Sequence, residues 1–145
     1  MPILTDWDES EKLLIRLYDG QVNAEEWGRV APTGWEFAGL RRVLSDLSRW
    51  ERDPSIDAPR IAAMGEKLAS AEGAHPIRQV IVANQDKFQS AQQFVAAFAK
   101  RGIQAIVLSD LDVACAWLNL DPMPVRSRIE RLRGAGRSSP VPTAR

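Results

Sequence analysis

The sequence predicts an α/β protein with a single mixed, largely parallel sheet of four to five strands and an N-terminal hairpin. Two observations support this class. The first is a pattern that occurs three times: a short run rich in β-branched residues leads through small polar or acidic residues into an amphipathic helical pattern. The runs occupy residues 42–48, 80–86 and 103–110. Strands that alternate with helices form largely parallel sheets. The second is the dipeptide Asp19-Gly20, a strong turn signal beside an alternating strand, which predicts the hairpin.

The first half of the chain contains the expected hairpin, a short helix and one further strand. Residues 12–18 alternate in hydrophobicity, and Val22 belongs to a short return strand. Asn23 and Glu26 have the spacing of a capping box, which predicts a helix through Trp27. The next strand is expected over residues 41–47, followed by a polar loop over residues 48–55.

The second half alternates helices and strands more regularly. Residues 57–73 have apolar positions at helical spacing, with Asp57 as the expected N-cap. Residues 80–83 are too apolar for a half-exposed strand and are expected at the centre of the sheet. A helix over residues 88–102, a strand over residues 103–108 and a helix beginning at Ser109 or Asp110 complete the pattern. The last three strands should be parallel, with the hairpin supplying an antiparallel edge.

The domain is expected to span residues 1–121, and residues 122–145 to form a weakly ordered tail rich in proline, serine and glycine. The tail carries six arginines and one glutamate, hence +5, whereas the other 121 residues carry 13 basic and 18 acidic side chains, hence −5. A short helix over residues 125–132 is expected to precede the disordered end. The basic tail is the only candidate contact for nucleic acid, and we expect no such binding.

The composition argues against several classes of protein. Cys115 is the only cysteine and lies in an apolar run, so no disulfide can form within the chain and a buried thiol is expected. Residues 1–11 are acidic and lack the features of a secretion signal, and no apolar run approaches the ~20 residues of a membrane helix. The simplest expectation is a bacterial, cytoplasmic protein with no membrane association.

No catalytic motif is evident. The only histidine, His75, precedes a proline, and no glycine-rich phosphate motif follows a strand, so we expect no catalytic residues, no metal site and no cofactor. Acidic residues at the ends of the expected strands are the remaining candidates for chemistry. Helix capping explains most of them, because Ser, Asn and Asp are ordinary residues at helix starts. The set comprises Asp46, Asp53, Asp86, Asp110 and Asp112.

Three stretches together resemble bacterial SpoIIAA-like or STAS-like domains. They are residues 20–27, residues 44–48 and the closing run 110–118, and the resemblance covers about residues 10–120. It rests on the order and phrasing of these stretches. It implies a mixed sheet with helices mainly on one face and a non-enzymatic role, because characterised antagonists of this type act by docking on a partner kinase.

The resemblance also implies a candidate phosphorylation site. In the antagonists a serine at a helix start is phosphorylated within an Asp-Ser-Ser-Gly phrase. The matching residues here are Asp53-Pro54-Ser55-Ile56, so Ser55 is the nearest counterpart, although the glycine is missing. A phosphate there would add about −1.5 to −2 charge near a helix N-terminus. The alternative is that Ser55 is only a loop or capping residue.

The leading hypothesis is a regulatory module that docks a protein partner through the loop after strand 41–47. Trp50 motivates it, because an aromatic flanked by charged residues is typical of an interface if it is exposed. The partner could be a serine kinase or an anti-sigma-type regulator, and a homodimer is a further option. One alternative is a carrier of a small apolar ligand between helices and sheet, and another is a carboxylate-based enzyme. The predicted partner-binding residues are Asp46, Ser48, Trp50, Asp53 and Ser55.

Overall fold

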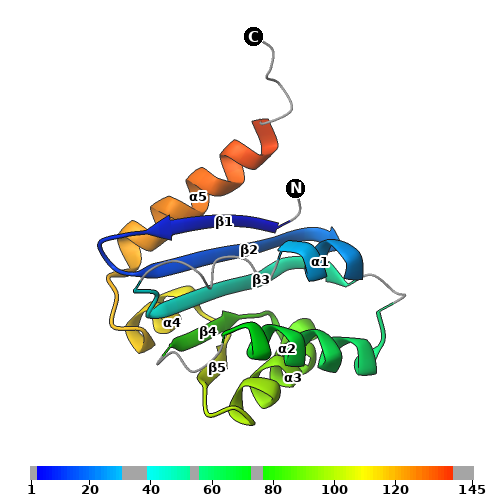
Figure 1. The fold of residues 1–145 in the computed structure, drawn as a ribbon. Coiled ribbons are helices and arrows are strands. Elements are labelled where there is room, and N and C mark those ends of the chain that lie inside the picture. The colour runs from blue at the N-terminus through cyan, green and yellow to red at the C-terminus, as the bar shows by residue number, and fades with distance from the viewer. Residues whose placement is uncertain (1–2, 31–38, 53–55, 73–76, 139–145) are drawn as a thin grey trace.

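Five strands form one sheet in the order in which they occur along the chain (Figure 1). The structure is a computed structural model that describes residues 3–30, 39–52, 56–72 and 77–138. β1 and β2 are antiparallel, and the pairs β2–β3, β3–β4 and β4–β5 are parallel. The predicted fold class is therefore confirmed, and the parallel part begins one strand earlier than expected. The strands are β1 (Ile3–Asp8), β2 (Leu13–Val22), β3 (Arg42–Arg52), β4 (Arg78–Val82) and β5 (Gln104–Leu108).

The N-terminal hairpin is present but uses other strands than the sequence suggested. β1 pairs with β2 from Ile3↔Tyr18 to Asp8↔Leu13, and residues 9–12 make the turn. Asp8 Oδ1 organises that turn, because it accepts hydrogen bonds from the backbone N–H groups of Ser10 and Glu11 at 3.0 and 3.2 Å. The expected turn at Asp19-Gly20 is wrong. Gly20 lies inside β2 with φ 78°, next to a register shift between β2 and β3.

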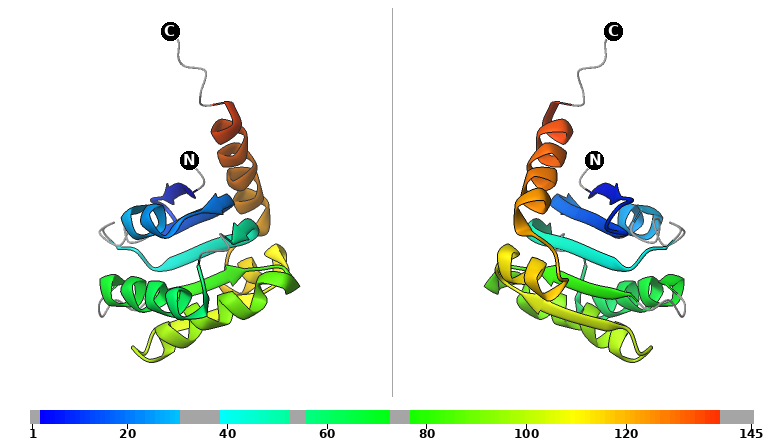
Figure 2. Two further views of the ribbon diagram at one scale, coloured as in Figure 1. Left: turned by 90° about the vertical axis from the view of Figure 1, so that its right-hand side faces the viewer. Right: turned by 90° about the vertical axis from the view of Figure 1, so that its left-hand side faces the viewer.

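Helices cover both faces of the sheet. α1 (Ala24–Val30), α2 (Ala58–Glu72) and α3 (Phe88–Ala99) pack on one face, which we call the first face. α4 (Leu111–Trp117) and α5 (Pro122–Ser138) pack on the second face. Figure 2 shows α1 and α2 on the opposite side of the sheet from α5. Three of the five α-helices in the described residues thus pack on the first face, where most of the helices were expected. The other two cover the second face.

Local signals identified in the sequence account for several helix starts. The Asn23 side chain accepts from the Glu26 N–H at 2.7 Å, and the Asp57 side chain accepts from the Arg60 N–H at 3.1 Å. Asp110 caps α4 by accepting from the N–H groups of Asp112 and Val113. A 3₁₀ turn over Gln85–Lys87 precedes α3. Asn23, Asp57 and Asp110 thus accept hydrogen bonds from backbone N–H groups that a helix leaves unpaired at its N-terminus.

The segment expected to be a tail begins with a long helix. α5 extends well beyond the expected residues 125–132, and it buries Val125 and Ile129 against the second face. Arg128 lies between two carboxylates of β1, with Nη1 2.5 Å from Asp6 Oδ2 and Nε 3.5 Å from Asp8 Oδ2. These contacts explain why an arginine-rich sequence is ordered here: apolar burial and ion pairing with an acidic strand both hold it. Residues 139–145 lie outside the described residues.

The length and hydropathy of the helices bear on membrane insertion. Among the described residues, no helix is both long and apolar enough to span a bilayer.

Candidate functional site: an aromatic pocket on the first face

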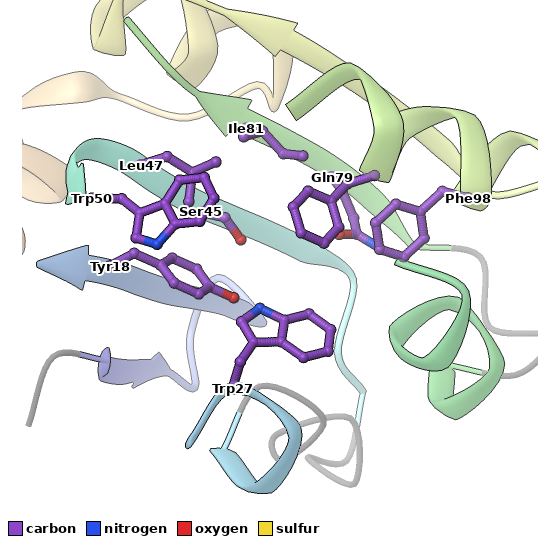
Figure 3. A pocket seen from close by; sticks show the side chains of 9 residues that line it. Tyr18, Trp27, Ser45, Leu47, Trp50, Gln79, Ile81 and Phe98 are labelled. Atoms are coloured by element: carbon purple, nitrogen blue, oxygen red, sulfur yellow. The ribbon is translucent and has the colours of Figure 1, made fainter. Parts of the chain in front are cut away.

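A pocket lies between the first face of the sheet and helices α1 and α3 (Figure 3). Its cavity volume is about 20 Å³, room for little more than one water molecule. The pocket is therefore a narrow crevice. Its lining consists mostly of aromatic and aliphatic side chains, from Tyr18, Trp27, Ser45, Leu47, Trp50, Gln79, Ile81, Phe94 and Phe98. We call these nine residues the aromatic pocket.

The strands supply the floor of the aromatic pocket through the alternation of side chains. Ser45 and Leu47 are two residues apart in β3, and Gln79 and Ile81 are two residues apart in β4, so each pair points to one face. Trp50 breaks this spacing. It reaches the same face because the pairing shifts from Leu17↔Asp46 to Asp19↔Arg49, which adds one residue to β3.

The helices supply the walls through stacked rings. Trp27 of α1 and Phe94 of α3 have ring centroids 6.0 Å apart and an interplanar angle of 26°. Offset stacking at this distance is favourable for aromatic pairs. This ring pair joins the two helices across the aromatic pocket.

A polar row runs through the apolar surroundings at the floor. Tyr18 is buried, and its hydroxyl oxygen accepts hydrogen bonds from the Arg16 guanidinium and the Trp27 indole N–H. Burial raises the pKa of Tyr18, against the opposing effects of the Arg16 charge and these two hydrogen bonds. Arg16 is fully buried and lies directly opposite Ser45 in the register of β2 and β3. Gln79, also buried, adds an amide on the next strand.

Figure 3 shows how these polar groups are directed. The Ser45 hydroxyl points toward the middle of the pocket, the Tyr18 hydroxyl points toward the Trp27 nitrogen, and the Gln79 amide lies beside Phe98. A few polar groups placed among aromatic walls are typical of sites that bind small molecules, since they orient a ligand that the walls desolvate.

The sequence-predicted docking residues are not gathered on one surface. Asp46 is buried on the second face, where Oδ2 is 3.1 Å from Arg133 Nη2. Trp50 is only 4% exposed and lines the aromatic pocket on the first face. The interface hypothesis for Trp50 required its side chain to be exposed, so its burial removes that argument for docking. The expected loop beginning at Ser48 is wrong, because β3 continues to Arg52. Asp53 and Ser55 lie outside the described residues.

Ser48 has a structural role at the β3 irregularity. Its N–H donates to Asp46 Oδ1 at 2.8 Å, and its carbonyl oxygen accepts from Asn84 Nδ2 at 3.0 Å. Ser48 and Asn84 thus hold β3, beside its irregularity, to the segment after β4. A bulged strand leaves backbone groups unpaired, and here the Asp46 and Asn84 side chains pair with the backbone N–H and carbonyl of Ser48.

The other strand-end carboxylates are also dispersed. Asp86 is 3.3 Å from Lys87 Nζ, Asp110 caps α4, and Asp112 forms an ion pair with Arg126. Within the described ranges, no three side chains among His, Cys, Asp and Glu cluster as a metal site would require.

Apart from Trp50, the residues of the aromatic pocket were not predicted as site residues. A signal was nevertheless present, because Arg16 in β2 and Gln79 in β4 are buried polar residues that interrupt runs of core-facing apolar residues. Polar residues at such positions need partners or ligands. What the sequence does not contain is the register that brings three strands and two helices together around them.

Comparison with known proteins leaves the family open. No protein-family model matches this chain, and no curated protein matches it.

Proposed function

We propose that this protein is a non-catalytic binding module that takes up a small, predominantly apolar ligand in the aromatic pocket. The observation that carries the proposal is the polar row at the floor of the aromatic crevice, where the half-buried Ser45 lies among the buried side chains of Tyr18 and Gln79. A core selected only for stability favours apolar side chains there, because each buried polar group has a desolvation cost. A ligand that hydrogen-bonds with Ser45 and stacks between the rings uses both features.

The shape of the crevice sets the class of ligand. Because little of the pocket admits a water molecule, the ligand should be flat, and its entry should part the Trp27–Phe94 stack. Single- or fused-ring compounds with one hydroxyl or N–H group meet these requirements. The free energy of binding would come mainly from burial of ring surface, at roughly 25 cal/mol per Å² before the costs of association.

The test is a methyl NMR titration of the full chain with indole and 2-naphthol. Leu47 and Ile81 line the pocket, whereas Leu118 and Val125 on the second face serve as internal references. Saturable shifts at the first pair alone are expected. The variant Ser45→Leu should fill the crevice and abolish them, and the matched control Ser109→Leu, at an exposed site, should not. Unchanged titrations in Ser45→Leu, or no saturable shift with either compound, would contradict the proposal.

A second candidate is the STAS-like regulatory module that docks a protein partner. It is supported by the mixed sheet with an N-terminal hairpin and by a hollow of about 320 Å³ at the carboxyl end of β3. Exposed Glu51 and Asp86 and half-buried Lys87 line this hollow. The carboxyl ends of parallel strands are where sites of α/β proteins usually lie. The partner, as the resemblance suggests, would be a serine kinase or an anti-sigma-type regulator.

The docking candidate has its own test. Incubation with a cognate serine kinase should phosphorylate Ser55, detected by mass spectrometry, and Glu51→Arg should weaken the kinase complex in sedimentation experiments. The control Glu66→Arg changes the same charge on α2, away from the hollow. Equal effects of the two substitutions would assign the change to net charge and not to docking.

A further inference from the structure

A further hollow, at the end of the sheet where β3 and β4 begin, is lined by three arginines. It has a volume of about 390 Å³ and is bounded by Arg41, Arg42, Arg78, Leu118 and Asn119. We call it the arginine notch. It lies where β3 and β4 begin and where α4 ends, so it is separate from the aromatic pocket.

Two of the arginines are direct neighbours across the sheet. Arg42 and Arg78 are paired in the parallel register of β3 and β4, and neighbouring strands are roughly 4.8 Å apart. Like charges placed opposite each other on adjacent strands are destabilising. Only Arg42 has a carboxylate partner among the described residues, with Nη1 2.8 Å from Glu11 Oε1. The arginine notch therefore keeps an excess of positive charge.

Arg78 is held in a defined orientation. Its guanidinium carbon is 4.2 Å from the centre of the Trp117 ring. An arginine stacked on an aromatic ring keeps the N–H groups at its edge available for a planar or tetrahedral anion. The stack thus reduces the rotamer entropy that a flexible surface arginine would lose on binding.

The backbone around the notch is also fixed. The N–H groups of Arg41 and Arg42 both donate to the Lys12 carbonyl, and the N–H of Arg78 donates to the Arg41 carbonyl, at 3.0–3.1 Å. At the end of α4, Asn119 has φ 61°, and the N–H of Leu120 donates to the Cys115 carbonyl at 2.8 Å. This is a Schellman closure, which satisfies helix-end carbonyls that would otherwise repel an anion.

We propose that the arginine notch binds a phosphate group, with Arg41 and Arg78 as the principal ligands and the Asn119 amide as a further donor. Guanidinium groups match the geometry of phosphate oxygens and pair with them in a bidentate manner. A dianion would also relieve the repulsion between Arg42 and Arg78. The phosphate could be inorganic or carried as a monoester on a small molecule.

The test is isothermal titration calorimetry of the full chain at constant ionic strength. Inorganic phosphate and phenyl phosphate are the two probes, with sulfate as the anion control. We expect saturable binding of at least one phosphate probe that is at least about tenfold tighter than sulfate, and preference between the two probes identifies the source. Arg78→Gln and Arg41→Gln should each weaken binding by about tenfold or more, because each removes charge-assisted hydrogen bonds.

The matched control is Arg60→Gln, an exposed arginine of α2 that does not line the notch. It should bind like the unmodified protein, and thermal melting should show that all three variants are folded. Absence of saturable binding at concentrations up to about 10 mM, tenfold above a millimolar Kd, would overturn the proposal. So would equal weakening in Arg60→Gln, or sulfate binding as tight as phosphate. None of these results depends on whether the aromatic pocket binds a ligand.

Discussion

Arg133 in α5 forms an ion pair with Asp46 in β3, across 87 positions of sequence and with Nη2 3.1 Å from Oδ2. Both side chains are largely buried, at 14% and 6% exposure. Asp46 also accepts from the Ser48 N–H, so one carboxylate joins the β3 irregularity to the far helix. The pair shows how the basic C-terminal segment becomes part of the domain.

Loss of Arg133 should destabilise the fold strongly. Arg133→Met leaves the Asp46 carboxylate buried without its cation, for which we expect about 3 kcal/mol lower free energy of unfolding. The measurement is urea unfolding followed by circular dichroism. Arg131→Met is the control, because Arg131 is exposed two residues earlier in the same helix. Adding Asp46→Asn to Arg133→Met should recover part of the loss, and a strictly additive double variant would contradict the pairing.

Close packing between α2 and α3 should make one glycine intolerant of a side chain. A Cβ at Gly65 would lie 3.2 Å from both Ala97 Cβ and Phe94 Cδ1. Gly65→Leu should therefore destabilise the protein by about 1–3 kcal/mol through overpacking. Thermal melting is the measurement, and a neutral Gly65→Leu would refute the tight α2–α3 contact.

Gly134 is the opposite case, because a Cβ there meets no atom within 4 Å. Gly134→Ala should accordingly raise the free energy of unfolding by about 0.5–1 kcal/mol, through helix propensity in α5. The same thermal melting experiment measures the gain. An unchanged melting temperature would argue against a stable helix in this part of α5.

The Tyr18 hydroxyl should matter for stability as well as for the pocket. Tyr18→Phe removes the acceptor for the Trp27 indole N–H and for Arg16. Leaving a buried donor without its acceptor costs about 1–3 kcal/mol, so we expect a loss in that range in urea unfolding. Trp7→Phe is a contrast, because the Trp7 indole donates to Glu9 at 2.9 Å in an exposed setting, where water can replace the bond. A smaller loss for Tyr18→Phe than for Trp7→Phe would contradict the buried network.

The parts of the fold that could be predicted are those determined by local sequence. The β4 and β5 segments are short apolar runs, and Asn23, Asp57 and Asp110 cap helices through their own neighbouring N–H groups. Such signals act within a few residues, so the sequence pattern contains them. The parallel pairing of β3, β4 and β5 follows from their alternation with helices.

The parts that could not be predicted depend on distant partners. β1 contains Asp6 and Asp8, which look unsuited to a strand until Arg128 of α5 neutralises them. Trp50 has charged neighbours, yet the register shift of β3 turns it into the aromatic pocket. Asp46 was predicted as a site residue because the sequence pattern does not show that its partner is Arg133, 87 positions away. In each case the decisive contact joins elements that local periodicity cannot relate.

Cys115 should be unreactive in the folded protein and should make stability fall at high pH. Its side chain is fully buried against the second face, and burial, aided by the Asp112 charge, raises the pKa of the thiol to about 11 from 9.0. Because the folded pKa lies above the unfolded value, the contribution to stability is present below pH 9 and is lost as the pH rises from about 9 to about 11. Thiol labelling at pH 8 should therefore be slow and should accelerate in denaturing urea. Cys115→Ala should lower stability at pH 7 but flatten its decline above pH 9, whereas fast labelling of the native protein would show that the thiol is accessible.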